Sequence, residues 1–360
     1  MGLTRRSHVR KSLFIHRELM TSRTPKVLFL TLKTFSFTGG VEKVCRGIGH
    51  ALQQIGDSNE AKFTLISLYD DETDERYVKK ENFKGYRGKR VAGALRAIQK
   101  GIKSDIIILS HINLAPIGVA IKTLAPSSKL ILWTHGIEVW RPINLVKKIL
   151  LKKLDKIVAV SSFTANEIKT RHNPDKQKVQ VIANALDPYF AVPDLVKSKK
   201  DLTFQKQCED LSRKLGIPQD SKVFLALTRL RKTEKDKNYD KVIVQLGELK
   251  KAGKETFYLI CGKYDQDEYE RIVDIALSVG FEKNIIVPGF IADEDIPCLY
   301  QLADAFLLPS TKEGFGLVFI EAQASGLFVL AGNQDGSTEA VRNNTGGVLI
   351  NPDNKEELRN

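Results

Sequence analysis

The sequence predicts an α/β protein with two doubly wound parallel sheets, each forming a Rossmann-like domain. Its 360 residues exceed what one ordinary core holds. Strand-sized apolar runs alternate with amphipathic helical segments, and this alternation pauses once, between Asp187 and Asp201, where prolines and a lysine-rich run indicate a linker. We therefore predict a disordered basic leader (1–23), an N-terminal domain (24–190), a linker (191–203) and a C-terminal domain (204–360).

The elements of the N-terminal half follow from hydrophobic periodicity. A buried-strand run covers 26–32, and apolar residues from Val41 to Ile55 recur at spacings of three, four and seven, which predicts a helix. Ser161 is the predicted cap of a later helix. The remaining strands of this half are predicted at 63–68, 105–110, 129–134, 156–160 and 179–182.

The C-terminal half repeats the pattern. Helices are predicted over 239–250 and 268–279, and strands over 223–227, 257–261, 284–287, 305–308, 328–331 and 347–350. The chain stops at Asn360, just after the start of a predicted helix at 354–358. We expect from this that a final helix is missing, either by truncation or because the protein is unusually short. Met20 is a second candidate start.

The chain is strongly basic, with a net charge of +13. Such an excess favours an anionic partner, namely nucleic acid, a membrane surface or a phosphorylated substrate. Lysines and arginines concentrate in 79–103 and 145–156, and the second segment is typical of a basic amphipathic helix on anionic lipid. A helix packed on a sheet with a solvated basic face is the commoner arrangement. No nucleic-acid-binding motif is recognisable, so we expect no nucleic-acid partner.

The four cysteines, Cys45, Cys208, Cys261 and Cys298, lie far apart and form no Cys-x-x-Cys pair. This spacing argues against a zinc site and against a disulfide framework. We expect four small buried thiols and a reducing compartment.

Two glutamates frame the most informative segment. Glu313 and Glu321 flank a glycine-rich turn that follows the strand at 305–308 and opens a helix near Leu317. Glycines allow the backbone to approach a ligand, and a helix N-terminus attracts an anion such as a diphosphate. If all eight steps were helical, the glutamates would be roughly 12 Å apart, which suits the two ends of an extended ligand. A surface glutamate followed by an unrelated helix glutamate explains the spacing equally well.

This Glu-x7-Glu block resembles the signature of the family-4 retaining glycosyltransferases of the GT-B fold. The resemblance continues through Gly336–Val341 and runs from about 26 to 353. It implies two Rossmann-like domains facing across a cleft, with Glu313 on the donor's hexose and Glu321 on its ribose. The implied donor contacts of this block are Glu313, Gly314, Phe315, Gly316, Leu317 and Glu321.

A basic pair is implied for the donor's diphosphate. Arg229 matches the family's arginine after the first strand of the C-terminal domain, and Lys237 matches the second cation. Lys232 and Lys235 lie close enough to be alternatives for that cation. Thr228 and Asn238 stand where the family has glycine. Two cations aimed at the leaving diphosphate would stabilise the charge that grows as the glycosidic bond breaks.

Other matches complete the implied site. Gly39 and Gly40 resemble the loop that closes over donor and acceptor, Gly262 lies in a turn near the nucleotide, and Phe290 lies near the base. His135 matches a histidine near the transferred sugar. A lone histidine is more often structural, but His135 ends a predicted parallel strand, where α/β sheets bind ligands. The implied catalytic set is Glu313, His135, Arg229 and Lys237.

The resemblance implies retaining transfer of a hexose from a UDP- or GDP-sugar to a glycan or lipid-linked acceptor in cell-surface polysaccharide synthesis. Neither a protein nucleophile, a cofactor nor a metal ion is expected. A cytoplasmic protein, peripheral at the inner membrane face, is the expected setting. The alternatives are a non-catalytic or truncated nucleotide-sugar-binding protein with this fold, or a UDP-sugar epimerase.

Overall fold

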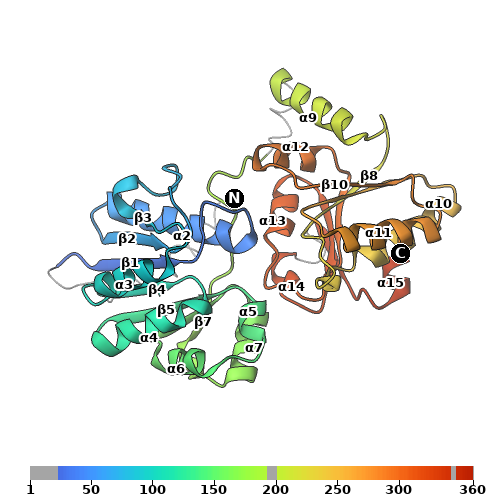
Figure 1. The fold of residues 1–360 in the computed structure, drawn as a ribbon. Coiled ribbons are helices and arrows are strands. Elements are labelled where there is room, and N and C mark those ends of the chain that lie inside the picture. The colour runs from blue at the N-terminus through green and yellow to red at the C-terminus, as the bar shows by residue number, and fades with distance from the viewer. Residues whose placement is uncertain (1–22, 193–200, 342–345, 360) are drawn as a thin grey trace, which may run out of the picture. The chain divides into compact units, whose positions relative to one another are not determined.

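The computed structural model describes residues 23–192, 201–341 and 346–359. It contains a seven-stranded sheet of order β3-β2-β1-β4-β5-β6-β7 and a six-stranded sheet of order β10-β9-β8-β11-β12-β13 (Figure 1). The central pairs of both sheets, including β1 with β4 and β8 with β11, are parallel. The predicted α/β class with two doubly wound parallel sheets is confirmed.

The first sheet forms from the predicted apolar runs, with Leu28, Phe29 and Leu30 fully buried in its central strand. Its strands are β1 (Lys26–Thr31), β2 (Lys62–Ser67), β3 (Phe83–Gly85), β4 (Ile106–Leu109), β5 (Lys129–Thr134), β6 (Lys156–Ala159) and β7 (Val179–Val181). The accompanying helices are α2 (Gly40–Asp57), α3 (Arg90–Gly101), α4 (Ala115–Leu124), α5 (Ile137–Trp140), α6 (Leu145–Lys153) and α7 (Ser162–His172). Ser161 caps α7 by accepting from the Thr164 N–H, as predicted.

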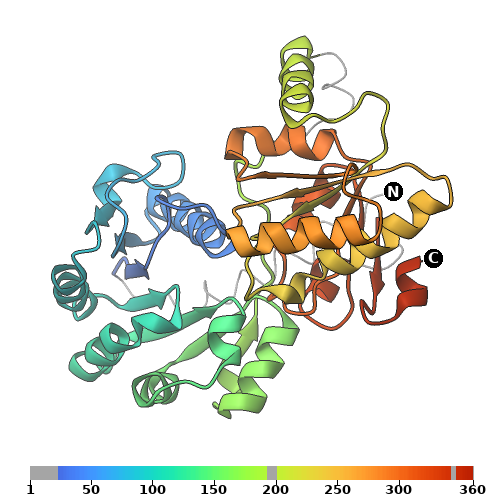
Figure 2. The same ribbon diagram turned by 45° about the vertical axis from the view of Figure 1, so that its right-hand side comes forward.

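The second sheet contains β8 (Val223–Leu227), β9 (Phe257–Cys261), β10 (Ile285–Gly289), β11 (Ala305–Leu308), β12 (Phe328–Gly332) and β13 (Gly347–Ile350). Its helices are α9 (Leu202–Leu215), α10 (Tyr239–Lys251), α11 (Gln266–Ser278), α12 (Ile296–Gln301), α13 (Leu317–Ala324), α14 (Ser337–Ala340) and α15 (Lys355–Arg359). Figure 2 shows α10 and α11 side by side along this sheet. Helix α9 starts inside the predicted linker because Asp201 caps it, accepting from the Thr203 and Phe204 N–H groups.

Each sheet has one point where the strand order reverses. In the second sheet the chain builds β8, β9 and β10 in one direction and then β11 to β13 in the other, so the reversal lies between β8 and β11. In the first sheet it lies between β1 and β4. Open α/β sheets bind ligands outside the carboxyl ends of the strands at such a point. The loops that follow β1, β4, β8 and β11 are therefore the places to look for a site.

By contacts, the chain divides into two compact units. The first comprises the described residues up to Trp133 together with Ile143–Ile157, and the second comprises Thr134–Pro142 and the described residues from Val158 onward. The loop after β5 therefore belongs to the unit that holds the second sheet. The domain boundaries 24–190 and 204–360 stay a prediction. The leader up to 22 and linker residues 193–200 lie outside the described residues.

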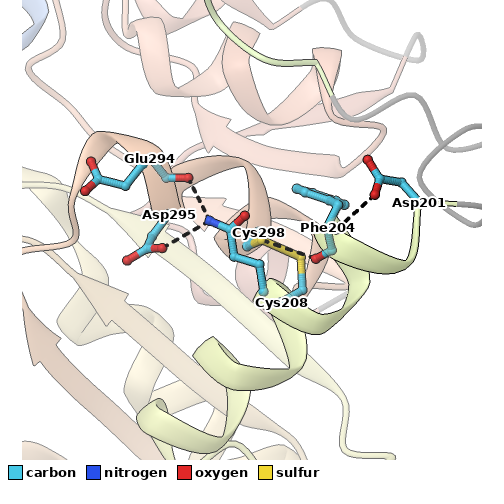
Figure 3. The surroundings of a disulfide bond; sticks show 7 residues. Asp201, Phe204, Cys208, Glu294, Asp295 and Cys298 are labelled. Carbon is cyan, nitrogen blue, oxygen red and sulfur yellow. Dashed lines mark hydrogen bonds between the residues drawn. A yellow bond between two sulfur atoms is a disulfide. The ribbon is translucent and has the colours of Figure 1, made fainter.

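The prediction of four free, buried thiols is right for two cysteines and wrong for the other two. Cys45 and Cys261 are free and buried, but Cys208 and Cys298 form a disulfide that joins α9 to α12 (Figure 3). The two are 90 positions apart, so only the packing of α9 on α12 brings them together, and no local spacing signals it. The cysteines therefore no longer argue for a reducing compartment, because that argument assumed four free thiols.

We expect Cys208→Ser to lower the free energy of unfolding of the oxidised protein by about 3–4 kcal/mol, since the bridge closes a long loop. Chemical denaturation with and without dithiothreitol measures this difference. The variant itself is the control, because the reductant should destabilise the natural chain and leave Cys208→Ser unchanged. Equal denaturation curves for the natural chain with and without reductant would contradict a stabilising bridge.

Among the described residues, no helix combines the length and the hydropathy needed to cross a membrane.

Candidate donor-binding site

Two loops at the reversal point of the second sheet are hydrogen-bonded to each other. The side-chain amide of Asn238 donates to the Pro309 carbonyl at 2.8 Å, and the Thr311 N–H donates to the Asp236 carbonyl at 2.8 Å. Asn238 has a φ of 55°, a left-handed conformation that asparagine tolerates better than most residues. This explains how it stands where the family has glycine. The loops after β8 and β11 thus form one continuous surface.

Lys237 and Glu313 meet on this surface in an ion pair. Lys237 ends a short 3-10 helix, Lys235–Lys237, and its side chain is 11% exposed, against 20% for that of Glu313. The structure therefore brings together two predicted site residues that are 76 positions apart in the chain. A charged pair that is largely removed from water interacts more strongly than a surface pair, so each group holds the other in place.

The other predicted cation, Arg229, follows β8 and is ion-paired with Glu234 at 3.0 Å. Its side chain is about half exposed, so it can change partner. The alternatives named for the second cation differ from Lys237: Lys232 forms an exposed ion pair with Asp267, and Lys235 is exposed. Of these three lysines, Lys237 is the one that is buried against Glu313.

His135 packs by its backbone on the glutamate loop. A Cβ built on Gly314 would lie 1.7 Å from the His135 carbonyl oxygen, so only glycine fits there. Gly136, with a φ of 145°, also faces Gly314, since its own Cβ would lie 3.1 Å from the Gly314 Cα. All these residues belong to the second compact unit. The loop after β5 is therefore adjacent to the loop that carries Glu313, and a contact of the His135 side chain with the donor stays a prediction.

The Glu-x7-Glu block is half loop and half helix. Helix α13 begins at Leu317, and Gly316 precedes it with a φ of 83°, a conformation that glycine adopts without strain. Phe315 and Leu317 are buried. Since the first four steps of the block are not helical, the rise of an all-helical segment does not apply to the separation of the two glutamates.

Glu321 is 1% exposed and accepts a hydrogen bond from the Tyr300 hydroxyl at 3.1 Å. Burial, and then the neighbouring carboxylate of Glu321, raises the pKa of Tyr300 well above its ordinary value. The hydroxyl therefore stays a donor and fixes the orientation of the Glu321 carboxylate. The sequence analysis missed Tyr300, because nothing in its local pattern on α12 distinguishes it from a core tyrosine.

Asp335 is a second residue that the sequence analysis missed. One carboxylate oxygen accepts from the Glu313 N–H at 2.5 Å and the other from the Ser337 N–H at 2.9 Å. The Gly336 N–H donates to the Glu313 carbonyl at 2.9 Å. The turn before α14 therefore holds the backbone of Glu313 on both sides.

Burial raises the pKa of Asp335 to about 6. Because the native state binds this proton more tightly than the unfolded chain, the residue's stabilising contribution is complete below about pH 4 and is lost as the pH rises through about 6. We expect the difference in unfolding free energy between the natural chain and Asp335→Asn to fall by up to about 3 kcal/mol across that window. Urea denaturation at several pH values measures it, and a flat or rising difference would contradict the raised pKa.

The remaining predicted residues lie after other strands. Gly262 follows β9 with a φ of 142°, and its Cβ would lie 1.7 Å from the Thr228 carbonyl oxygen, so the predicted turn is present. Phe290 follows β10 and is exposed. Gly39 and Gly40 follow β1 at the start of α2, at the reversal point of the first sheet. They belong to the first compact unit, so the structure does not place them relative to Glu313. Donor contacts of these residues stay predictions.

Two family models together match most of the chain. Residues 38–190 match the model described as Glycosyltransferase Family 4, and residues 207–360 match the one described as Glycosyl transferases group 1. The chain belongs to the family-4 glycosyltransferases of the GT-B fold. These matches confirm the family that the Glu-x7-Glu block predicted.

Curated relatives of this family-4 chain are distant. An uncharacterized glycosyltransferase of Methanocaldococcus jannaschii is 25% identical over 56% of this chain and 48% of its own length. A GDP-mannose-dependent alpha-(1-6)-phosphatidylinositol monomannoside mannosyltransferase of Mycobacterium tuberculosis is 25% identical over 63% of this chain and 57% of its own length. The match spans between 23% and 57% of the curated relatives' own lengths.

Solved structures agree on the fold of this family-4 chain. The Anabaena protein HepE, crystallised with UDP, superposes with a TM-score of 0.70 at 19% identity, covering 93% of this chain and 88% of that one. At this level of identity the likeness establishes the GT-B fold alone.

Proposed function

We propose that this protein transfers a hexose, with retention, from a UDP- or GDP-sugar to a glycan or lipid-linked acceptor in cell-surface polysaccharide synthesis. The observation that carries the proposal is the ion pair between Lys237 and Glu313, at the reversal point of the second sheet. A pair of opposite charges there suits a ligand that has an anionic part beside a hydroxyl-rich part. A nucleotide-diphosphate sugar is such a ligand.

Donor binding would exchange partners within the site. Lys237 would leave Glu313 for the diphosphate, Glu313 would accept from hexose hydroxyls, and Arg229 would leave Glu234 for the second phosphate. The bond between the anomeric carbon and the phosphate oxygen breaks as the bond to the acceptor oxygen forms on the same face. The acceptor's proton passes to the departing diphosphate, so no protein nucleophile is needed. The two cations stabilise the charge that accumulates on the leaving group.

The choice between uridine and guanosine stays open within the proposal. The relative from Mycobacterium tuberculosis is named for GDP-mannose, and HepE was crystallised with UDP. Release of nucleoside diphosphate from a panel of donor sugars, with glycan and lipid-linked acceptors, tests the activity. Nuclear magnetic resonance of the first product tests its anomeric configuration. Absence of release across the panel, or an inverted product, would overturn the proposal.

We also propose that transfer needs no metal ion, because Arg229 and Lys237 supply the positive charge that a divalent cation would otherwise provide. The chelator EDTA should therefore change the initial rate by less than about twofold, because it removes no charge that stabilises the transition state. A rate assay with and without excess EDTA measures this. Complete loss of the rate, restored by magnesium or manganese, would contradict this.

For the setting, we propose action in the cytoplasm at the inner membrane face. Support comes from the two basic segments of the N-terminal half, which are suited to anionic lipid, and from the lipid-linked acceptor in the proposed reaction. Fractionation of the native cells tests this proposal. Recovery of the protein outside both the cytoplasm and the membrane fraction would contradict it.

A further inference from the structure

Helix α3 exposes aliphatic side chains that a surface helix normally buries. Val91, Leu95 and Ile102, at its start, middle and C-terminal cap, are 76%, 58% and 40% exposed. Their spacings of four and seven place them along one stripe. The buried side of α3 consists of small residues: a Cβ built on Gly93 would meet Leu68, and one built on Gly101 would meet Ile121 of α4. The helix thus packs on the domain mainly through small residues and leaves Val91, Leu95 and Ile102 exposed.

The same segment is rich in cations and holds no carboxylate. No aspartate or glutamate occurs between Asn82 and Ser104. Arg87 is ion-paired with Asp71, and the other cations of the segment form no ion pair with any residue in the described part of the chain. Those cations, all exposed, are Lys84, Lys89, Arg90, Arg96, Lys100 and Lys103.

Neighbouring helices extend this surface. In the first compact unit, α3 packs on α4 and α4 packs on α6 (Figure 1). Leu124 at the end of α4 and Leu145 at the start of α6 are also exposed, and Lys148 and Lys152 of α6 face solvent. The sequence drew attention to 145–156, but α6 buries Leu150 and Leu151 against the domain. The apolar stripe therefore lies mainly on α3.

We propose that α3, with the exposed ends of α4 and α6, lies on an anionic lipid bilayer. Val91, Leu95 and Ile102 would enter the boundary between headgroups and acyl chains, while the flanking lysines and arginines meet lipid phosphates. A nucleic acid would use the cations but would leave the aliphatic stripe in water. The stripe therefore favours the bilayer over the other polyanion.

This inference deepens the proposed function, because it names the surface by which the enzyme would reach a lipid-linked acceptor. Vesicle binding is measured without donor or acceptor, so it can succeed where the transferase assay fails, and the reverse also holds. The assay is co-sedimentation of the full chain with vesicles of phosphatidylcholine alone, or of phosphatidylcholine and phosphatidylglycerol in equal parts. We expect binding to the mixed vesicles alone, and weaker binding as salt is raised.

Two variants test the surface. Leu95→Ser should lower the partition coefficient about tenfold, the effect of withdrawing one aliphatic side chain from the interface. The double variant Arg96→Glu/Lys100→Glu should lower it by at least about tenfold, because it replaces attraction to anionic lipid with repulsion.

Matched controls lie in the second compact unit. Leu277→Ser removes a leucine that is 62% exposed on α11, and Lys206→Glu/Lys214→Glu makes the same change in net charge on α9. Both should bind vesicles like the natural chain, and melting temperatures check that every variant folds. Equal binding to neutral and mixed vesicles, no binding, or undiminished binding of the α3 variants would overturn the proposal. Binding of single-stranded RNA without vesicle binding would overturn it as well.

Discussion

Lys237→Met is expected to lower kcat/KM for the donor sugar by about 10²- to 10³-fold, the usual effect of removing one preorganised charge from a developing anion. Methionine keeps the length of the lysine side chain but removes the ammonium charge that is ion-paired with Glu313. Without that charge, neither the Glu313 carboxylate in the free protein nor the diphosphate in the donor complex has its partner. Steady-state rates with the best donor of the panel measure the effect.

The control is Lys235→Met, two positions earlier in the same 3-10 helix. Lys235 is exposed, so its loss should change kcat/KM by less than about twofold, as expected for a screened surface charge. If both variants lost activity equally, the effect would come from the net charge of the loop. If neither did, Lys237 would not be the second cation.

Gly314→Ala is expected to destabilise the protein by several kcal/mol, about the upper end of the cost of overpacking, and to abolish donor binding. The added Cβ would lie 1.7 Å from the His135 carbonyl oxygen and 3.3 Å from the Gly136 Cα. Both neighbours are backbone atoms and cannot rotate away. The loop that carries Glu313 would have to move away from the loop after β5. This movement would separate Glu313 from Lys237. Chemical denaturation and donor titration measure the two effects.

The control is Gly47→Ala, in the middle of α2, where an added Cβ would meet no atom within 4 Å. That change should stabilise the protein slightly, by about 0.5–1 kcal/mol, because alanine is the better helix former. A Gly314→Ala protein as stable as the natural chain would mean that the close approach of the two loops does not exist in solution.

The sequence predicted those elements whose signal is local. Strand β1 and helix α2 follow from apolar runs and spacings, and the cap at Ser161 from one residue type in one place. The sequence analysis made no prediction for helix α3, and periodicity alone does not tell which side of a helix is buried. Gly93 and Gly101 decide that, because they let α3 approach its neighbours closely and leave the larger residues outside.

From the sequence, the site could be predicted only for residues in the segments that resemble the family. The pairing of Lys237 with Glu313 joins two segments that the resemblance had already marked. Tyr300 and Asp335 hold Glu321 and Glu313 from outside the block, and the disulfide joins α9 to α12 across 90 positions. Such partners depend on tertiary packing, which a single sequence does not reveal.

The most direct test of the donor site is a thermal-shift titration with UDP, GDP and ADP, comparing the natural chain with Glu321→Gln. Glutamine keeps the size of the side chain and an acceptor for Tyr300, but lacks the charge that strengthens a hydrogen bond to ribose. A diphosphate at a hundred times its dissociation constant should stabilise the natural chain by about 2.7 kcal/mol. We predict that one of the three does so, and that its affinity for Glu321→Gln is at least about tenfold weaker. If no diphosphate stabilises the natural chain, or if one stabilises both proteins equally, the assignment of this site to a nucleotide-sugar donor is contradicted.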